Sequence, residues 1–294
     1  MSPTVVLITG ANRGLGEGII KRYLAKPNHT VIAANRNPDD PTSKALSNFP
    51  TGPGSSLIVV KIDATSETDA PTAIQELKGQ GINHLDIVIA NAAFIVPFVK
   101  IEDAKIADLR VNFETNIYGF FMLYQATLPL LLKSQRPTWI TIGSGAGSIV
   151  VSTPVSLIFL TQLTIGGSEL LYPHSHIITV STEFTYTLPV PKTQLMNLSN
   201  QLPVPNAVYG PTKAAQHWLT KRINAEEERI CAFIMSPGWV QTPGGNSSAQ
   251  MLGLKEAPQP VDETCDGMVA VFDKAGKETH GGKFLTWEGK EESW

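Results

Sequence analysis

The chain has 294 residues, of which 42 % are hydrophobic and 17 % charged, and its formal net charge is −3 at pH 7. This length and composition provide a sizeable core and exclude an intrinsically disordered protein. The slightly negative charge argues against a nucleic-acid binder, because neutralising phosphates requires a clearly basic surface.

The N-terminus carries no pattern typical of a secretory signal. Met1–Pro3 lead directly into the apolar run Thr4–Thr9, without a basic region or a cleavage site. No run approaches the roughly 18 apolar residues that a transmembrane helix needs. The two cysteines, Cys231 and Cys265, are too few for a disulfide scaffold. We therefore expect a cytoplasmic protein without a membrane partner.

Short apolar runs alternate with helix-length amphipathic segments along most of the chain. The runs predict buried strands at Val5–Thr9, Thr30–Ala34, Leu57–Ile62, Leu85–Ala90, Trp139–Gly143, Ile230–Met235 and Lys283–Thr286. Helices are predicted at Leu15–Leu24, Ser43–Ser47, Asp69–Lys78, Asp103–Lys133, Ala207–Glu226 and Val261–Lys274, with a loop from the sixth strand through Gly253. The alternation predicts an α/β fold, a doubly wound parallel sheet of about seven strands with helices on both faces.

A glycine-rich turn, Thr9–Gly16, follows the first predicted strand and opens the first predicted helix. Such a turn lets the backbone approach a pyrophosphate, and the helix N-terminus offers unpaired N–H groups to it. A glycine trio alone also occurs in ordinary turns, but this one follows the first strand of a βαβ series. The position therefore favours a dinucleotide site.

The residue after the second strand indicates which dinucleotide is bound. An NAD-selective site usually has an acidic residue here, whereas this chain has Asn35 and Arg36. Arg36 and Arg13 are two cations near the expected position of a 2′-phosphate, although both also suit a solvated surface. We expect NADP(H) as the cofactor.

Further motifs in the expected order resemble the short-chain dehydrogenase/reductase family. They are Thr9–Gly16, Asp63, Asn91-Ala92-Ala93 (where Ala93 departs from the family's glycine), Asn116, Ser144, Tyr209 with Lys213, and Pro237–Thr242. The resemblance covers about residues 4–150 and 200–294 and implies a single-domain Rossmann fold over 1–294. Within the family, the chain is similar to fungal norsolorinic-acid ketoreductase-like proteins.

The resemblance assigns the site residues. It implies cofactor contacts from Gly10, Asn12, Arg13, Gly14, Leu15, Gly16, Arg36, Asp63, Asn91, Tyr209, Lys213, Val240 and Thr242. It also implies that Ser144 orients the substrate oxygen and that Asn116 holds a water linking Lys213 to solvent.

The pair Tyr209 and Lys213 carries the expected acid–base chemistry. The two residues are four apart, so they share one helix face. We expect the positive charge of Lys213 to lower the pKa of Tyr209, which then acts as general acid in reduction and general base in oxidation. Each residue alone has an ordinary structural explanation, and only their combined order after a dinucleotide turn is specific.

The chain departs from the family between Ser144 and Tyr209, which lie 65 positions apart rather than one short loop apart. From about Val150 to Asn200 no period appears, and only Glu169, Glu183 and Lys192 are charged. The segment is either a genuine insertion over the substrate mouth or a translated intron, and its alien composition favours the intron. A spliced transcript that retains the codons for 151–198 would exclude that explanation.

Together the residues predict an NADP-dependent short-chain dehydrogenase/reductase that reduces a ketone or aldehyde, or oxidises the matching alcohol. The narrower resemblance points to an aromatic or polyketide-derived ketone of secondary metabolism. The alternatives are a non-catalytic NADP-binding sensor and a protein that the insertion inactivates. We expect no metal site, and the family resemblance implies a homo-oligomer that pairs through the long helices 103–133 and 207–226.

Overall fold

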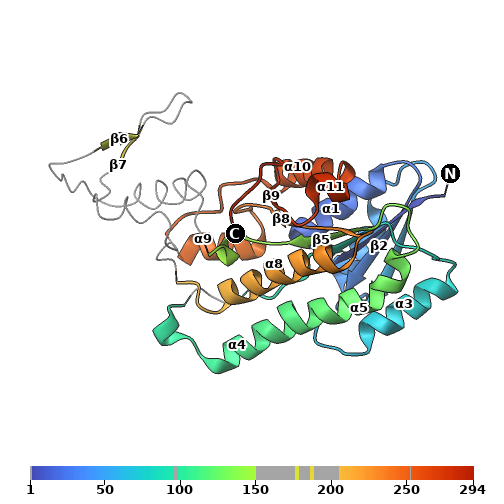
Figure 1. Ribbon diagram of the computed structural model, residues 1–294, viewed down its shortest axis with the longest axis horizontal. Coiled ribbons are helices and arrows are strands. Elements are labelled where there is room, and N and C mark those ends of the chain that lie inside the picture. The colour runs from blue at the N-terminus through green and yellow to red at the C-terminus, as the bar shows by residue number, and fades with distance from the viewer. Residues whose placement is uncertain (1, 96–98, 150–175, 179–185, 189–204, 252) are drawn as a thin grey trace.

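The computed structural model describes residues 2–95, 99–149, 176–178, 186–188, 205–251 and 253–294 (Figure 1). Most of the segment predicted to be an insertion therefore lies outside the described residues. Within it, β6 (His176–Ile178) and β7 (Tyr186–Leu188) pair as an antiparallel ribbon, which the sequence pattern did not indicate.

A seven-stranded sheet forms the centre of the fold, with the strand order β3-β2-β1-β4-β5-β8-β9. Its strands are β1 (Thr4–Thr9), β2 (His29–Asn35), β3 (Ser56–Lys61), β4 (Ile87–Ala90), β5 (Thr138–Ile142), β8 (Cys231–Ser236) and β9 (Phe284–Thr286). Every neighbouring pair is parallel, which confirms the predicted doubly wound sheet. The order reverses between β1 and β4, and ligands of such sheets bind at this switch point.

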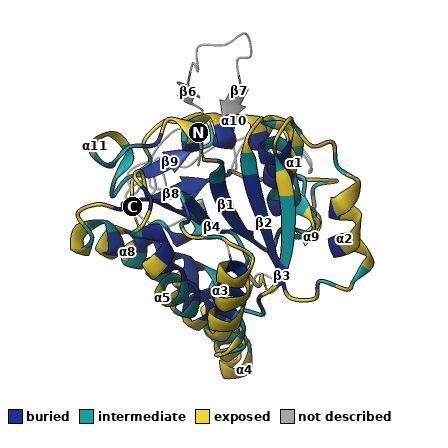
Figure 2. Cartoon of the chain, turned by 90° about the vertical axis from the view of Figure 1, so that its right-hand side faces the viewer, coloured by how far each residue is buried: buried dark blue, intermediate teal, exposed yellow. Residues whose placement is uncertain are grey.

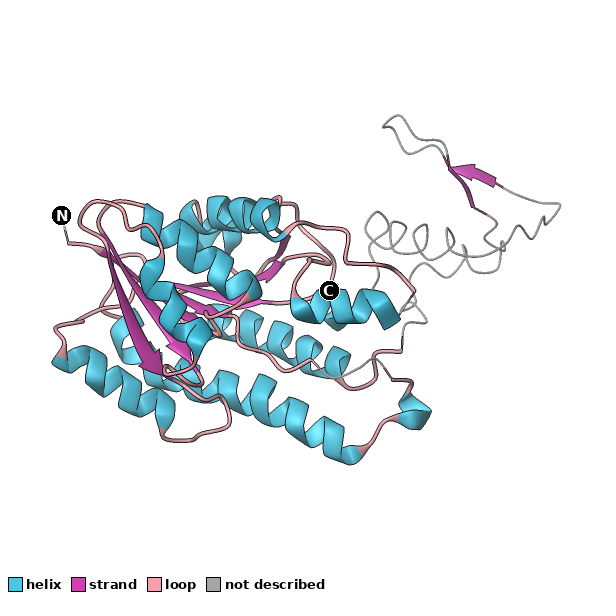
Figure 3. Cartoon of the chain, turned by 180° about the vertical axis from the view of Figure 1, so that it is seen from behind, coloured by secondary structure: helices cyan, strands magenta, loops and turns pink. Residues whose placement is uncertain are grey.

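Helices cover both faces of the sheet, as Figures 1 and 3 show. The described helices are α1 (Gly14–Ala25), α2 (Pro41–Ala45), α3 (Asp69–Gly79), α4 (Ile106–Phe113), α5 (Gly119–Leu131), α8 (Tyr209–Glu226), α9 (Pro243–Met251), α10 (Val261–Asp273) and α11 (Lys277–His280). None of these helices has the length and apolar character needed to cross a membrane.

The alternation of side chains along each strand divides the core in two. Val6 and Ile8 of β1 pack with residues of α1 and α10, whereas Val5 and Leu7 pack with residues of α3 and α5. The central strands are therefore buried between two layers of helices and are dark blue in Figure 2, whereas the edge strand β3 is mostly half-buried or exposed. Cys231 is buried in β8, where it packs as a small hydrophobic residue.

The long helix predicted over Asp103–Lys133 is interrupted. A 3₁₀ turn at Ile101–Asp103 precedes α4, and a π-helical turn at Glu114–Tyr118 separates α4 from α5. Such turns insert extra residues into a helix and often occur at functional sites. Here the π turn contains the buried Asn116, which a regular apolar period cannot reveal.

The loop predicted through Gly253 contains α9, so that prediction was wrong. Its glycines and serines hid the helix, but Thr242 followed by Pro243 is a start signal: the Thr242 hydroxyl accepts a hydrogen bond from the Gly245 N–H at 3.0 Å. The short α11 was missed as well.

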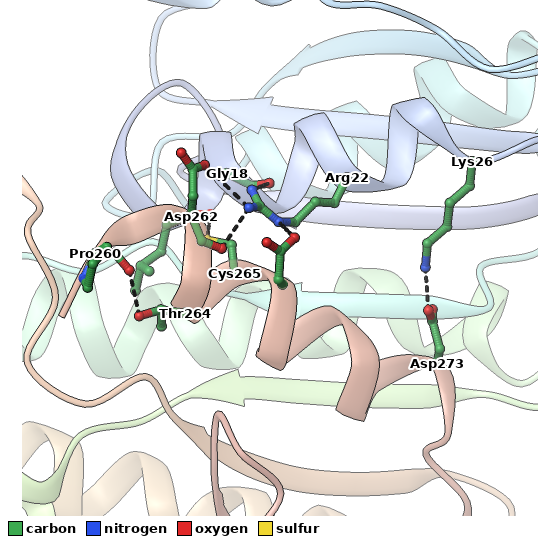
Figure 4. Close-up of polar contacts among 10 residues, drawn as sticks. Gly18, Arg22, Lys26, Pro260, Asp262, Thr264, Cys265 and Asp273 are labelled. Carbon is green, nitrogen blue, oxygen red and sulfur yellow. Dashed lines mark hydrogen bonds and ion pairs between the residues drawn. The ribbon is translucent and has the colours of Figure 1, made fainter.

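Helix α10 holds α1, and with it the glycine-rich turn, against the sheet (Figure 4). The guanidinium of Arg22 donates to Asp266 at 2.6 Å and to the backbone carbonyl of Asp262 at 2.6 Å, and Lys26 pairs with Asp273. Gly18 permits the close approach, because a Cβ there would lie 2.5 Å from Cys265 Sγ.

Candidate active site

The glycine-rich turn has the geometry that a dinucleotide requires. Gly10 and Gly14 have φ angles of 61° and 56°, a region in which side chains are strained. A Cβ on Gly16 would lie 2.2 Å from the Gly10 carbonyl oxygen, so only glycine fits. The side chain of the N-cap residue Arg13 makes no capping hydrogen bond to the described start of α1, so the first N–H groups of this helix are available to a pyrophosphate. The residues present therefore fit a dinucleotide cofactor.

Asn91, at the end of β4, forms hydrogen bonds to the backbone and to the Thr9 side chain of this turn. Its Nδ2 donates to the carbonyl oxygens of Thr9 at 2.8 Å and Gly10 at 3.1 Å, and its backbone N–H donates to Thr9 Oγ1 at 3.1 Å. In this arrangement the Asn91 side chain fixes the shape of the turn.

The two arginines predicted to bind a 2′-phosphate lie at the ends of β1 and β2. Arg13 and Arg36 are both exposed, and neither guanidinium group has a hydrogen bond or ion pair with another described residue. Asn12, beside them, donates to Thr42 Oγ1 at 2.7 Å. Both guanidinium groups are thus available to a ligand.

Asp40 is an acidic residue near this corner that the sequence analysis did not consider. It lies 3.5 Å from Asn12 Nδ2, but its Oδ1 caps α2 by accepting hydrogen bonds from the N–H groups of Thr42 at 2.8 Å and Ser43 at 2.9 Å. These bonds, with one from the Thr42 hydroxyl, hold the pKa of Asp40 below its usual range.

Two further segments border the turn. Asp63 follows β3 and accepts hydrogen bonds from the Thr65 N–H at 2.9 Å and its hydroxyl at 2.8 Å. Thr242 follows β8, and its Cγ2 would lie 3.3 Å from a Cβ on Gly14. Val240, on the same segment, is buried. The structure thus brings the ends of β1, β3, β4 and β8 to one edge of the sheet.

Ser144 and Tyr209 also meet at this edge, although 65 positions separate them in the sequence. Ser144 follows β5, Tyr209 begins α8, and the Ser144 hydroxyl interacts with the Tyr209 phenol. The chain on either side of the segment 151–198 closes on itself, because Asn206 Nδ2 donates to the Ala146 carbonyl at 3.2 Å. The extra length therefore does not separate the two side chains.

Lys213 lies one helical turn after Tyr209 and is 2 % exposed. Its Nζ is 5.5 Å from the centre of the Tyr209 ring. The same Nζ donates to the Ile142 carbonyl at 2.8 Å and to Gln216 Oε1 at 2.9 Å. The predicted shared helix face is confirmed, and β5 supplies one of the two acceptors for the ammonium.

The pKa of Tyr209 differs in direction from our expectation. Removal from water raises it above its ordinary value of 10.0, and the Ser144 hydroxyl opposes this rise. Burial also lowers the pKa of Lys213 to about 7, so near neutral pH only part of this side chain carries the positive charge that we expected to act on Tyr209. Near neutral pH the phenol is therefore protonated, while Lys213 is close to its midpoint.

Asn116, predicted to hold a water, uses its side chain to bind protein groups. Its Nδ2 donates to the Phe94 carbonyl at 3.0 Å and to Thr212 Oγ1 at 3.1 Å, and its Oδ1 accepts from the Phe94 N–H at 2.8 Å. Its backbone carbonyl accepts from Gln216 Nε2 at 2.7 Å. The relay through a water stays a prediction.

Two residues that the sequence analysis missed belong to this network, Gln216 and His217. Their positions three and four residues after Lys213 could have indicated them, because this spacing places them on the same helix face as Lys213. His217 Nε2 accepts from the Ser144 N–H at 3.3 Å. Burial and the nearby Lys213 lower the pKa of His217 to about 3, so the ring is neutral. No metal-binding group of three His, Cys, Asp or Glu residues occurs among the described residues.

The chain resembles known proteins along its whole length. A family model described as short chain dehydrogenase matches residues 4–155. Norsolorinic acid ketoreductase nor1 of Dothistroma septosporum is 33 % identical over 286 residues, covering 97 % of this chain and 90 % of the relative. Short-chain dehydrogenase srdF of Neurospora crassa is 33 % identical over 294 residues, covering 99 % of this chain and 98 % of the relative.

A solved structure supports the same relationship. The NADPH-bound carbonyl reductase from chicken fatty liver has a TM-score of 0.71 and 26 % sequence identity, and each chain is covered completely. With these comparisons, the parallel sheet and the glycine-rich turn, the chain belongs to the short-chain dehydrogenase/reductase family of oxidoreductases.

Proposed function

We propose that this protein is an NADPH-dependent reductase of a ketone or aldehyde, and that it catalyses the reverse oxidation of the matching alcohol. One observation carries the proposal. Ser144, Tyr209 and Lys213 converge beside the glycine-rich turn, with the Lys213 ammonium 5.5 Å from the Tyr209 ring. A protein that only bound a dinucleotide would not need this buried group of polar side chains.

The chemistry follows from the state of each side chain. Bound NADPH supplies the hydride. Tyr209 is protonated near neutral pH because its surroundings raise its pKa, so it can donate a proton to the developing alkoxide. Ser144 shares the same edge and orients the substrate oxygen. The ammonium of Lys213 stabilises the tyrosinate that remains after proton transfer.

Arg13 and Arg36 support the choice of NADPH over NADH. Both guanidinium groups are exposed at the strand ends, and Asp40 is engaged in capping α2. The proposed substrate is an aromatic, polyketide-derived ketone of secondary metabolism, since the fungal relatives named norsolorinic acid ketoreductases are 31 % to 33 % identical. A cytoplasmic location and a homo-oligomer complete the proposal.

The test combines NADPH binding with turnover in the full-length chain and in Tyr209→Phe. Energy transfer from tryptophan to the nicotinamide reports binding, with NADH as the comparison. We expect Tyr209→Phe to bind NADPH within about threefold of the wild type and to lose at least 10²-fold in turnover, the scale of general acid catalysis. Equal turnover by the two proteins would favour the non-catalytic sensor instead.

Binding also tests the third alternative, a protein inactivated by its extra segment. Micromolar binding of NADPH and much weaker binding of NADH would support the proposal. No binding of either cofactor by the full-length chain would mean that the segment prevents the site from forming.

A further inference from the structure

The acceptors of Lys213 show an unusual feature of this chain. One of them is the side-chain oxygen of Gln216, at 2.9 Å from Nζ. The other end of the same amide donates through Nε2 to the Asn116 carbonyl at 2.7 Å. The Gln216 side chain, 2 % exposed, therefore spans the distance between Lys213 and the π-helical turn.

The surroundings of Lys213 make this contact important. On α8 its titratable neighbours are Tyr209, which is protonated, and His217, which is neutral. Its Nζ donates to the carbonyl of Ile142 on β5, and its Cβ lies against Gly147. No carboxylate forms an ion pair with Lys213 among the described residues. A buried ammonium without a counter-ion depends on its hydrogen-bond acceptors.

The amide is itself held in one orientation. Because Nε2 donates to the Asn116 carbonyl, the amide oxygen must face Lys213. Gln216 also lines a cavity of about 30 Å³ between β4 and the π turn, together with Thr9, Thr115 and Gly119. The side chain thus stands between this water-sized space and the ammonium.

We propose that Gln216 is a positioning residue that holds the Lys213 ammonium under Tyr209, by accepting from Nζ while the Asn116 carbonyl fixes its amide. This inference deepens the proposed function. It also rests on that function, because the proposed function assigns Lys213 its role beside Tyr209. Gln216 acts through Lys213. Loss of the acceptor destabilises the charged form of Lys213 and so lowers the lysine pKa.

The test reads the ionisation of Lys213 directly. The full-length chain is labelled with [6-¹³C]lysine, and the Lys213 signal is assigned by its absence in Lys213→Met. Gln216→Leu fills the volume without an acceptor, so that no water replaces the amide. Gln216→Glu keeps an oxygen beside Nζ and adds a negative charge. Thr220→Val, one turn further along α8, removes a buried hydroxyl that bonds Thr141 and the Gln216 carbonyl.

We expect the pKa of Lys213 to fall by about one unit in Gln216→Leu and to rise by about one unit in Gln216→Glu, while Thr220→Val leaves it unchanged. The pH profile of alcohol oxidation by Gln216→Leu should shift upward by a similar amount, because the tyrosinate loses a neighbouring positive charge over more of the pH range.

An unchanged Lys213 titration in both Gln216 variants would overturn the inference. If Gln216→Leu does not fold, Gln216→Glu alone decides by the same criterion. The proposed function fails separately: wild-type protein that binds NADPH but reduces no carbonyl compound would overturn that function, even where the lysine titration responds to Gln216.

Discussion

Lys213 illustrates the cost of a buried charge at the scale of a single residue. Burial lowers its pKa from 10.5 to about 7. Below pH 7 both the folded and the unfolded chain are protonated, and the folded protein bears the full cost of the buried ammonium. Between pH 7 and pH 10 the folded protein releases this proton first, so the cost disappears as the pH rises.

We therefore predict that the free energy of unfolding of the wild type rises relative to that of Lys213→Met by about 3 kcal/mol between pH 7 and pH 10. Denaturant titrations of both proteins at several pH values measure the difference, and the subtraction removes the other titrating groups. Parallel pH dependences would show that burial does not lower the pKa of Lys213.

Arg36 offers a second test with single residues. Arg36→Ala should weaken NADPH binding about tenfold or more and leave NADH binding unchanged, because a guanidinium pairs with the 2′-phosphate through charge-assisted hydrogen bonds. Lys44→Ala is the matched control: it removes the same charge from an exposed position on α2. Equal losses for both cofactors would contradict the role given to Arg36.

The contact between α1 and α10 decides the geometry at the scale of elements. A Cβ on Gly18 would lie 2.5 Å from Cys265 Sγ, whereas one on Gly79 of α3 would meet nothing within 4 Å. Alanine favours a helix over glycine by about 1 kcal/mol, but overpacking costs about 1–3 kcal/mol. The two glycines should therefore respond in opposite directions.

We predict that Gly18→Ala lowers the melting temperature by a few degrees, while Gly79→Ala leaves it unchanged or raises it slightly. Cys265→Ala should reduce the loss caused by Gly18→Ala, since it removes the clashing sulfur atom, and a double-mutant cycle measures this coupling. Additive effects of the two substitutions would mean that α1 and α10 are not in the close contact described.

At the scale of the whole molecule, the extra segment can be tested by removal. The ends of the chain around it already meet through Ala146 and Asn206, at 3.2 Å. Deleting 151–198 should therefore keep NADPH binding and raise the stability by about 1 kcal/mol, because a shorter loop costs less entropy to close. Loss of cofactor binding on deletion would identify the segment as a genuine functional insertion.

The oligomeric state is the second prediction at this scale. Trp218 on α8 and Phe121 on α5 are 64 % and 43 % exposed, unusual for large apolar side chains on the two helices expected to pair. Light scattering should give twice the monomer mass, and Trp218→Glu should reduce it. Ile101→Glu, an exposed apolar position outside both helices, is the control. A monomeric wild type would contradict the prediction.

The sequence by itself determined the order of the seven strands of the parallel sheet, most of the helices between them and the position of the glycine-rich turn. These follow from local patterns, since the spacing of Val5–Thr9 and the glycines of Gly10–Gly16 is visible without tertiary contacts. Prediction from the sequence failed for α9, because the glycines and serines of this helix carry no apolar period. It also failed for the π turn around Asn116, because a regular apolar period cannot show an inserted turn.

Only the tertiary structure decided how the site is assembled. It brings Ser144 to Tyr209 across 65 positions, gives Lys213 its acceptors on β5 and Gln216, and places His217 behind Ser144. It also reversed the expected direction of the Tyr209 pKa, because burial by the surrounding elements raises this pKa and cannot be read from the sequence. A sequence motif names these side chains, but their distances and ionisation depend on contacts between distant parts of the chain.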